Sequence, residues 1–150
     1  MSLLVALALA RTTLGGWDQW AVFRDDAPAR CYAIAAPVRR GPSRWEPFAS
    51  IATWPRARVR LQLHARLSRQ VAPGSDTIAS VGALRIPLVT NGVDAWTRGA
   101  RDDAALATAM RGGRNLNISG TALNGTRFTD TYVLAGAATA LDAATLACAR

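Results

Sequence analysis

Apolar and polar residues alternate most regularly over residues 58–67. Every second side chain of this segment is apolar, and those between are arginine, glutamine or histidine. A period of two places the apolar side chains on one face of a β-strand and the polar ones on the other. A helix over the same residues would put Arg60 and His64 beside the apolar stripe. We therefore predict a half-buried strand with its apolar positions at Val59, Leu61, Leu63, Ala65 and Leu67.

Shorter apolar runs bounded by turn residues predict further strands along the chain. Pro55 ends one of them, and Asn91-Gly92 and Asn124-Gly125 are dipeptides typical of tight hairpin turns. A turn through residues 25–28 joins the first two. The expected strands are residues 17–24, 31–36, 48–54, 58–67, a pair between 77 and 88, 93–96, 115–121 and 127–134.

Two segments carry helix signals instead. Asp102 and Asp103 suit the start of a short helix, and Gly112-Gly113 suits its end, so we expect a helix over about residues 103–111. The alanine-rich residues 137–149 show helical spacing of Leu141, Thr145 and Cys148. About eight strands and two short helices indicate a mainly β fold. We predict a single-domain antiparallel β-sandwich or partly open barrel over residues 11–150.

The first ten residues have a different character. Residues 3–10 read LLVALALA and contain two small-x-small sequences that a signal peptidase accepts. We interpret residues 1–10 as the remnant of a signal peptide; the alternative is a buried first strand or helix.

The two cysteines bear on the same question. Cys31 lies in an expected strand, and Cys148 lies near the end of the second expected helix. One early and one late cysteine suit a single disulfide, which persists in oxidising compartments and is rare in the cytosol. Two buried free thiols are the alternative. The disulfide and the signal-peptide remnant together favour a periplasmic or secreted protein.

The net charge of +8 comes from arginine alone, since the chain contains no lysine. A strongly basic domain is typical of nucleic-acid binding. Arginine-rich, alanine-rich and lysine-free composition is equally what a GC-rich genome produces, and these arginines are dispersed. We therefore favour codon bias as the main source of the charge, with a local basic face as its functional part.

Catalytic and metal-binding patterns are weak. His64 is the only histidine, there is no Gly-x-Ser-x-Gly sequence, and the Asp25-Asp26 and Asp102-Asp103 pairs lack calcium-loop spacing. We predict no catalytic residues, metal or cofactor. The candidates for contact with an anionic partner are a loop group, Arg39, Arg40, Arg44 and Trp45, and a strand group, Arg58, Arg60 and Arg66.

Several segments in order resemble the invasion-associated locus B family of exported alphaproteobacterial proteins. They are WAVFRDDAPARCYAI at 20–34, RWEPFASIATWP at 44–55, VRLQLHARLSR at 59–69 and DTYVLAGAATALDAATLACAR at 130–150. The resemblance implies a signal-bearing β-sandwich in the periplasm or on the cell surface, with no known enzymatic reaction.

We expect a non-enzymatic exported protein that interacts with an envelope or extracellular partner. An anionic partner fits the arginines best, since guanidinium groups bind carboxylate and phosphate bidentately. Candidates are an anionic polysaccharide, lipopolysaccharide or an acidic protein. The alternatives are a small periplasmic hydrolase on the same fold and a nucleic-acid-binding basic domain.

Overall fold

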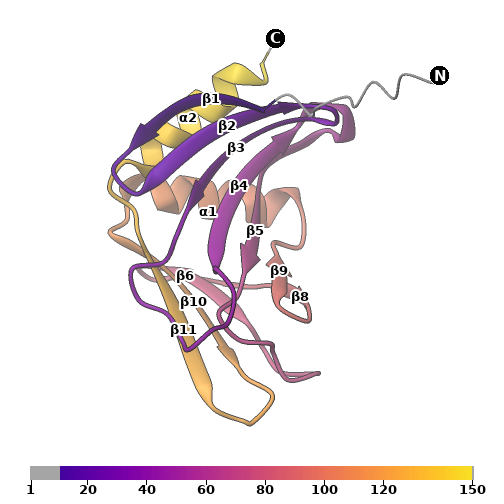
Figure 1. Ribbon diagram of the computed structural model, residues 1–150, viewed down its shortest axis with the longest axis vertical. Helices are drawn as coiled ribbons and strands as arrows, with labels where there is room; N and C mark the ends of the chain where they lie inside the picture. Colours follow the sequence, from indigo (N-terminus) through magenta and orange to yellow (C-terminus); the bar gives the residue numbers. More distant parts are fainter. Residues whose placement is uncertain (1–10, 150) are drawn as a thin grey trace, which may run out of the picture.

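The computed structural model describes residues 11–149, which form two β-sheets and two α-helices (Figure 1). A 3-10 turn, η1 (Pro55–Ala57), connects two of the strands. The helices are α1 (Ala100–Gly112) and α2 (Ala137–Ala147). The strands are β1 (Arg11–Trp17), β2 (Trp20–Asp26), β3 (Ala29–Ala35), β4 (Phe48–Trp54), β5 (Val59–Arg66), β6 (Ile78–Val81), β7 (Leu84–Pro87), β8 (Val89–Asn91), β9 (Asp94–Trp96), β10 (Asn115–Thr121) and β11 (Arg127–Val133).

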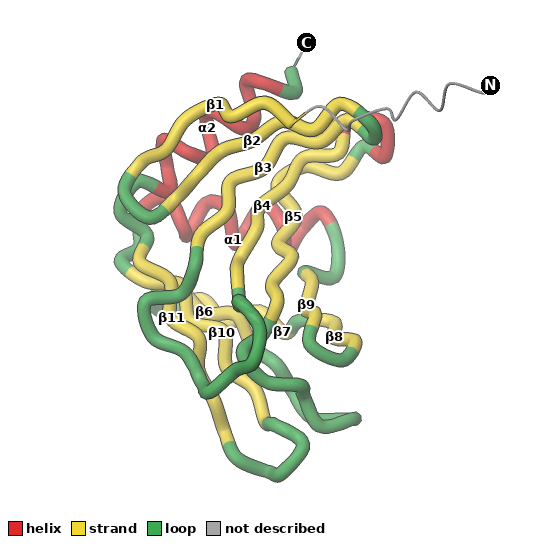
Figure 2. Tube along the Cα trace, in the orientation of Figure 1, coloured by secondary structure: helices red, strands yellow, loops and turns green. Residues whose placement is uncertain are grey.

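Both sheets are antiparallel. The seven-stranded sheet has the order β1-β2-β3-β4-β5-β9-β8, and the four-stranded sheet has the order β11-β10-β6-β7. Neither closes into a barrel, and Figure 2 shows the larger sheet as a curved layer above the smaller one. The predicted mainly β fold with two antiparallel sheets is confirmed.

The two helices cover one face of the seven-stranded sheet. In Figure 1 they lie behind β1 to β5, and α2 contacts β1, β2 and β3 while α1 contacts β5. Side chains that point toward the helices, such as Val22, Ile51 and Leu63, are 0 to 1% exposed. Leu141 of α2 is also fully buried among them. The opposite face of the sheet carries half-buried aromatic and charged side chains instead.

The strands predicted from strong patterns are observed with nearly the same bounds. The predicted 48–54 strand is β4, and the predicted 58–67 strand is β5 with one residue fewer at each end. Residues 11–149 form eleven strands rather than the expected eight or so. β1 was not predicted, because apolar and polar residues do not alternate in its sequence, RTTLGGW. Its pairing with β2 is also irregular, with a register shift between Thr13 and Gly15.

The helices are placed as predicted, with different ends. α1 begins three residues before 103, since its first turn includes Ala100 and Arg101, and it ends at Gly112. α2 begins at Ala137 as predicted and ends at Ala147, so that Cys148 is its C-cap.

Cys148 is joined to Cys31 on β3 by a disulfide, with the two Cα atoms 5.9 Å apart. The predicted pairing is confirmed, and it fastens the end of α2 to the middle of the larger sheet. The proposed signal-peptide remnant, residues 1–10, lies outside the described residues. Within residues 11–149 no helix is long and apolar enough to cross a membrane.

Candidate ligand-binding cavity

A cavity of about 480 Å³ lies between the start of β5 and helix α1. Its volume falls within the range of small-molecule sites. The two elements that form its walls come from separate parts of the chain. The lining residues are Arg58, Val59, Arg60, Leu61, Gln62, Gly99, Ala100, Asp103, Ala104, Ala107, Thr108 and Arg111.

Three arginines surround this cavity. Arg58 and Arg60 are exposed and form no ion pair with any residue between 11 and 149. Arg111, from the last turn of α1, donates a hydrogen bond from Nη1 to Asp142 Oδ1 of α2 at 2.6 Å. Two guanidinium groups are thus available to a negatively charged ligand, and a third is held by an exposed partner.

The interior of the cavity is largely apolar. Val59 and Leu61 contribute from the strand, and Ala104 and Ala107 contribute from the facing side of α1. Residues three and four apart lie on the same helix face, so Ala100, Ala104, Ala107 and Arg111 share one side. Alanine at these positions leaves room that larger side chains would fill.

The backbone beside the cavity adopts an unusual conformation. Among residues 11–149, three residues other than glycine have φ in the left-handed region, and two of them are Arg58 (φ 55°) and Leu61 (φ 52°). The pairing of β4 with β5 shifts register here, between Ala52 and Trp54, so the strand carries a β-bulge. Bulges redirect side chains, and left-handed conformations cost free energy that functional sites often retain. The bulge ends the regular alternation of β5 where the cavity begins.

A buried hydrogen-bond chain fixes α1 against β5 at the bottom of the cavity. The backbone N–H of Leu63 donates to Thr97 Oγ1 at 3.3 Å, and that hydroxyl donates to Asp103 Oδ1. Burial raises the pKa of Asp103, while the hydrogen bond from Thr97 acts in the opposite direction. Because both residues are buried, they position the helix that carries Ala104 and Arg111.

A second cavity of about 390 Å³ adjoins the first and shares Arg58, Val59 and Arg60 with it. Its other walls include Thr53, Thr145 and the disulfide-bonded Cys148. The two arginines therefore stand between two hollows, one along α1 and one beside the end of α2.

The structure separates Arg66 from the rest of the strand group. Arg58 and Arg60 line the cavity, whereas Arg66 donates from Nε to Asp94 Oδ1 at 3.3 Å. His64 contacts the same oxygen through Nε2 at 2.9 Å, and its ring stacks on Trp96 at 5.1 Å between centroids. Both side chains lie on the sheet face that the helices leave uncovered.

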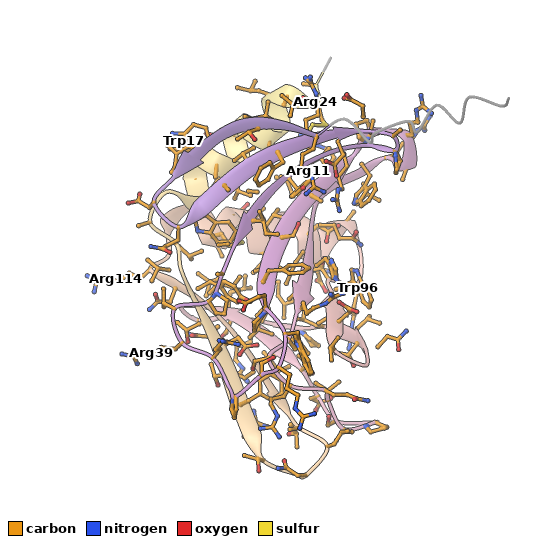
Figure 3. All side chains as sticks on the ribbon, in the orientation of Figure 1. Arg11, Trp17, Arg24, Arg39, Trp96 and Arg114 are labelled. Atoms are coloured by element: carbon orange, nitrogen blue, oxygen red, sulfur yellow. A yellow bond between two sulfur atoms is a disulfide. The ribbon has the colours of Figure 1, made fainter. Side chains whose placement is uncertain are left out.

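The loop group lies at a different place. Trp45 is half-buried and donates from Nε1 to the carbonyl of Leu67 at 2.7 Å, so it anchors the loop. Arg40 donates to the carbonyl of Trp45 at 3.4 Å, and Arg44 and Trp45 line a separate hollow of about 460 Å³. Arg39 extends away from the body of the molecule (Figure 3). The predicted contact residues thus occupy three separate places.

Comparisons with known proteins reveal similarity in structure. No family model and no curated protein matches the sequence. The crystal structure of invasion associated protein B from Bartonella henselae superposes with a TM-score of 0.65, over 91% of this chain and 97% of that one, at 13% sequence identity. The two proteins share a fold. The resemblance inferred from the sequence is confirmed at that level.

Two sets of charged residues at cavities were missed by sequence reasoning. Arg111 was not among the predicted contact residues, although its spacing of seven and four residues from Ala104 and Ala107 places all three on the same helix face. The other set is Arg11, Asp25 and Arg30, where Asp25 accepts from Arg11 Nε at 3.0 Å and from Arg30 at 2.8 Å. Arg30 also lies over the ring of Tyr32, at 4.1 Å from its centroid. Only the pairing of β1, β2 and β3 brings these residues together.

The exposed guanidinium groups of Arg58 and Arg60 are able to donate hydrogen bonds to an anion at the first cavity. Among residues 11–149 no group of three or more histidine, cysteine or acidic side chains is arranged to hold a metal ion. His64 lines neither the two cavities at Arg58 and Arg60 nor the hollow at Trp45. The first cavity combines cationic side chains at its edge with an apolar interior, an arrangement suited to recognition.

Proposed function

We propose that this protein is an exported, non-enzymatic binding protein that captures an anionic partner of the cell envelope or the extracellular space at the cavity between β5 and α1. The observation that carries the proposal is that Arg58 and Arg60, without acidic partners between residues 11 and 149, flank this cavity. Arg60 lies on β5, which was predicted from the sequence, Arg58 directly precedes this strand, and the facing helix supplies Arg111.

Arginine suits this role better than a general positive charge would. A guanidinium group donates in a planar fork that matches carboxylate and phosphate oxygens, and it is less strongly hydrated than an ammonium group. Arg58 and Arg60 are exposed, but Val59 and Leu61 lie beside them. A ligand that covers these apolar side chains would also exclude water from its hydrogen bonds to the two arginines, which strengthens those bonds. Specific binding is therefore favoured here over diffuse attraction to the +8 surface.

Export is supported by the disulfide between Cys31 and Cys148. Disulfides of this structural kind persist in oxidising compartments. The apolar residues 3–10, interpreted as the remnant of a signal peptide, support the same location. We propose a periplasmic or secreted protein.

The non-enzymatic part of the proposal rests on how His64 is used. Its ring is stacked on Trp96, and Nε2 contacts Asp94, which also accepts from Arg66. His64 and Asp94 are both partly exposed. A hydrolase needs a concave site in which such a dyad meets a nucleophile and the substrate, so binding is the better account of this surface.

The proposal is tested by isothermal titration of the purified, oxidised protein with lipopolysaccharide, polygalacturonate and duplex DNA. The test variant is Arg58→Ser/Arg60→Ser, and the control is Arg85→Ser/Arg127→Ser, which removes two exposed arginines of the smaller sheet. Both double variants lower the net charge equally. Two lost charge-assisted hydrogen bonds should weaken binding of the true partner about tenfold or more, with little change in the control.

Three results would contradict the proposal. Equal weakening by both double variants would mean that the whole basic surface attracts the partner. Tight binding of DNA alone would favour the nucleic-acid alternative. No binding to any of the three would remove the anionic partner from the proposal.

A further inference from the structure

We infer that the ligand of the cavity between β5 and α1 is an anionic amphiphile, a carboxylate or phosphate group that carries an unbranched apolar chain. This inference rests on the proposed function, since it names the class of ligand for the same site. Of the three anionic partners considered above (an anionic polysaccharide, lipopolysaccharide and an acidic protein), it favours the one that carries apolar chains.

The distribution of polar and apolar groups is the first argument. Arg58, Arg60 and Arg111 supply the positive charge, and all three are exposed. The larger part of the wall is apolar: Val59 and Leu61 are half-buried, Ala107 is buried, and Ala100 and Ala104 lie nearer the solvent. The polar wall residues besides the arginines are Gln62, Asp103 and Thr108. A ligand that satisfies both parts must be charged at one end and apolar at the other.

Acidic polysaccharides and acidic protein segments satisfy the arginines, but much of the cavity wall suits them poorly. Their hydroxyl or amide groups could meet Gln62 and Thr108, whereas those that face Val59, Leu61 and Ala107 would find no hydrogen-bonding side chain. Burying a polar group without a partner costs about 1–3 kcal/mol in proteins. An alkyl chain has no such cost and gains the apolar contact instead.

The form of the cavity is the second argument. The small side chains of Ala100, Ala104 and Ala107 leave space along one side of α1. On the other side of this space, the bulge at Leu61 interrupts the regular path of β5. The adjoining hollow extends past Arg58 and Arg60 to Thr145 and Cys148. An elongated chain can lie along α1 while its charged group meets the two arginines between the hollows.

The inference is tested with a series of n-alkyl phosphates from hexyl to dodecyl, titrated as monomers below their micelle concentrations. Each added methylene that enters the cavity should tighten binding by about two- to fourfold, the upper limit being equivalent to about 0.8 kcal/mol per methylene. Inorganic phosphate should bind weakly, and decyl maltoside, which lacks the charge, should bind at least tenfold more weakly than decyl phosphate.

Matched variants separate the apolar interior from the arginines. Ala104→Gln puts an amide into the cavity and leaves every charge unchanged, so the dependence on chain length should flatten. The control is Thr139→Gln, an exposed position on α2 outside this cavity, where the chain-length dependence should persist. Arg58→Ser/Arg60→Ser should weaken every alkyl phosphate by a similar factor and keep the dependence on chain length.

The outcomes distinguish this inference from the proposed function. If polygalacturonate binds in an arginine-dependent way while chain length has no effect, the inference is overturned and the proposed function stands. If chain length matters equally in wild type and Ala104→Gln, the chain binds elsewhere and the inference is again overturned. If neither class binds, both fail.

A further experiment with lipid vesicles distinguishes a membrane lipid from a soluble amphiphile. Sedimentation with phosphatidylglycerol vesicles, compared with phosphatidylcholine vesicles, reports on ligands that remain in a membrane. Binding to dodecyl phosphate together with arginine-dependent sedimentation points to a membrane lipid. Binding to dodecyl phosphate without sedimentation points to a soluble amphiphile, and either result supports the inference.

Discussion

Asp130 on β11 accepts two hydrogen bonds from Ser68, one from the backbone N–H at 2.8 Å and one from the hydroxyl at 2.5 Å. A third comes from the backbone N–H of Gly41 at 3.3 Å. Asp130 and Ser68 are both 0% exposed. This single carboxyl therefore holds the segment after β5 and the loop before β4 against the smaller sheet.

Replacing this carboxyl should destabilise the protein in a pH-dependent way. In Asp130→Asn the amide nitrogen faces a donor, and an unmatched buried group costs about 1–3 kcal/mol. Burial raises the pKa of Asp130 in the folded protein, against hydrogen bonds from Ser68 and Gly41 that lower it. The folded state thus binds the proton more tightly than the unfolded chain, and wild type loses stability as the pH rises through the raised pKa.

The amide variant has no titrating group at this position, so it does not gain the stability that wild type gains at low pH. The difference in free energy of unfolding between wild type and Asp130→Asn should therefore be larger near pH 4 than at pH 7. Urea denaturation of both proteins at the two pH values measures this difference. An equal deficit at both values would contradict the raised pKa. The other titrating groups are shared by the two proteins and cancel.

The disulfide should contribute much of the stability. Cys31 and Cys148 are separated by 117 residues in the sequence, and closing a loop of about a hundred residues removes about 4–5 kcal/mol of unfolded-state entropy. Cys31→Ala/Cys148→Ala should lose a comparable amount in urea denaturation. Reductant should shift the wild-type transition toward that of the variant and leave the variant unchanged. A wild-type transition indifferent to reductant would mean that the bond does not form in solution.

Gly136 should tolerate no side chain. It precedes α2 with φ at 83°, and a Cβ there would overlap the backbone carbonyl of Trp17. Gly125 has nearly the same φ, 82°, with no heavy atom near the corresponding Cβ position. Gly125→Ala should therefore cost only the left-handed penalty of about 1–2 kcal/mol. Gly136→Ala should cost clearly more in thermal denaturation, and equal losses would contradict the close approach.

Sequence patterns predicted those elements that have one face in the core and the other toward solvent. β5 was found because its buried residues, such as Leu63 and Ala65, alternate with residues of the uncovered face. β1 was missed because it is an edge strand whose glycines, Gly15 and Gly16, carry no such alternation. The pairing that makes it a strand is with β2, through contacts that a local pattern does not contain.

The cavity was predictable only on the strand side. Arg58 and Arg60 were named, but the period of two also grouped Arg66 with them. The bulge at Leu61 and the αL conformation of Arg58 end that period, and neither is apparent from residue types. Arg111 joined the site through the packing of α1 on β5, which depends on tertiary structure.

At Arg58 the residue that suits the backbone differs from the residue that suits binding: the left-handed conformation favours glycine, whereas anion binding requires the guanidinium group. Because its φ of 55° favours glycine, Arg58→Gly should be more stable than Arg58→Ser by about 1 kcal/mol. Both variants lose the guanidinium and should bind the anion equally weakly. Arg60, whose φ is not in the left-handed region, provides the control, since Arg60→Gly should be less stable than Arg60→Ser. The same order of stability at both positions would contradict the αL assignment.

Removing the partner of Arg111 should strengthen anion binding. The Arg111–Asp142 pair is exposed on both sides, with 38% and 61% of the two side chains accessible, so its contribution to stability is about 1 kcal/mol or less. Asp142→Ser leaves Arg111 free at the edge of the cavity. A third available guanidinium should tighten binding of an alkyl phosphate by about two- to fivefold at low salt.

The matched control is Asp76→Ser, which changes the net charge equally at an exposed turn away from the cavity. Titration of both variants with decyl phosphate at two salt concentrations gives the comparison. A gain in Asp142→Ser alone, diminished by salt, identifies Arg111 as a contact of the ligand, since exposed charges are screened over about 8–10 Å at physiological salt. Equal gains in both variants would instead assign the effect to net charge, and the ligand would then meet only Arg58 and Arg60.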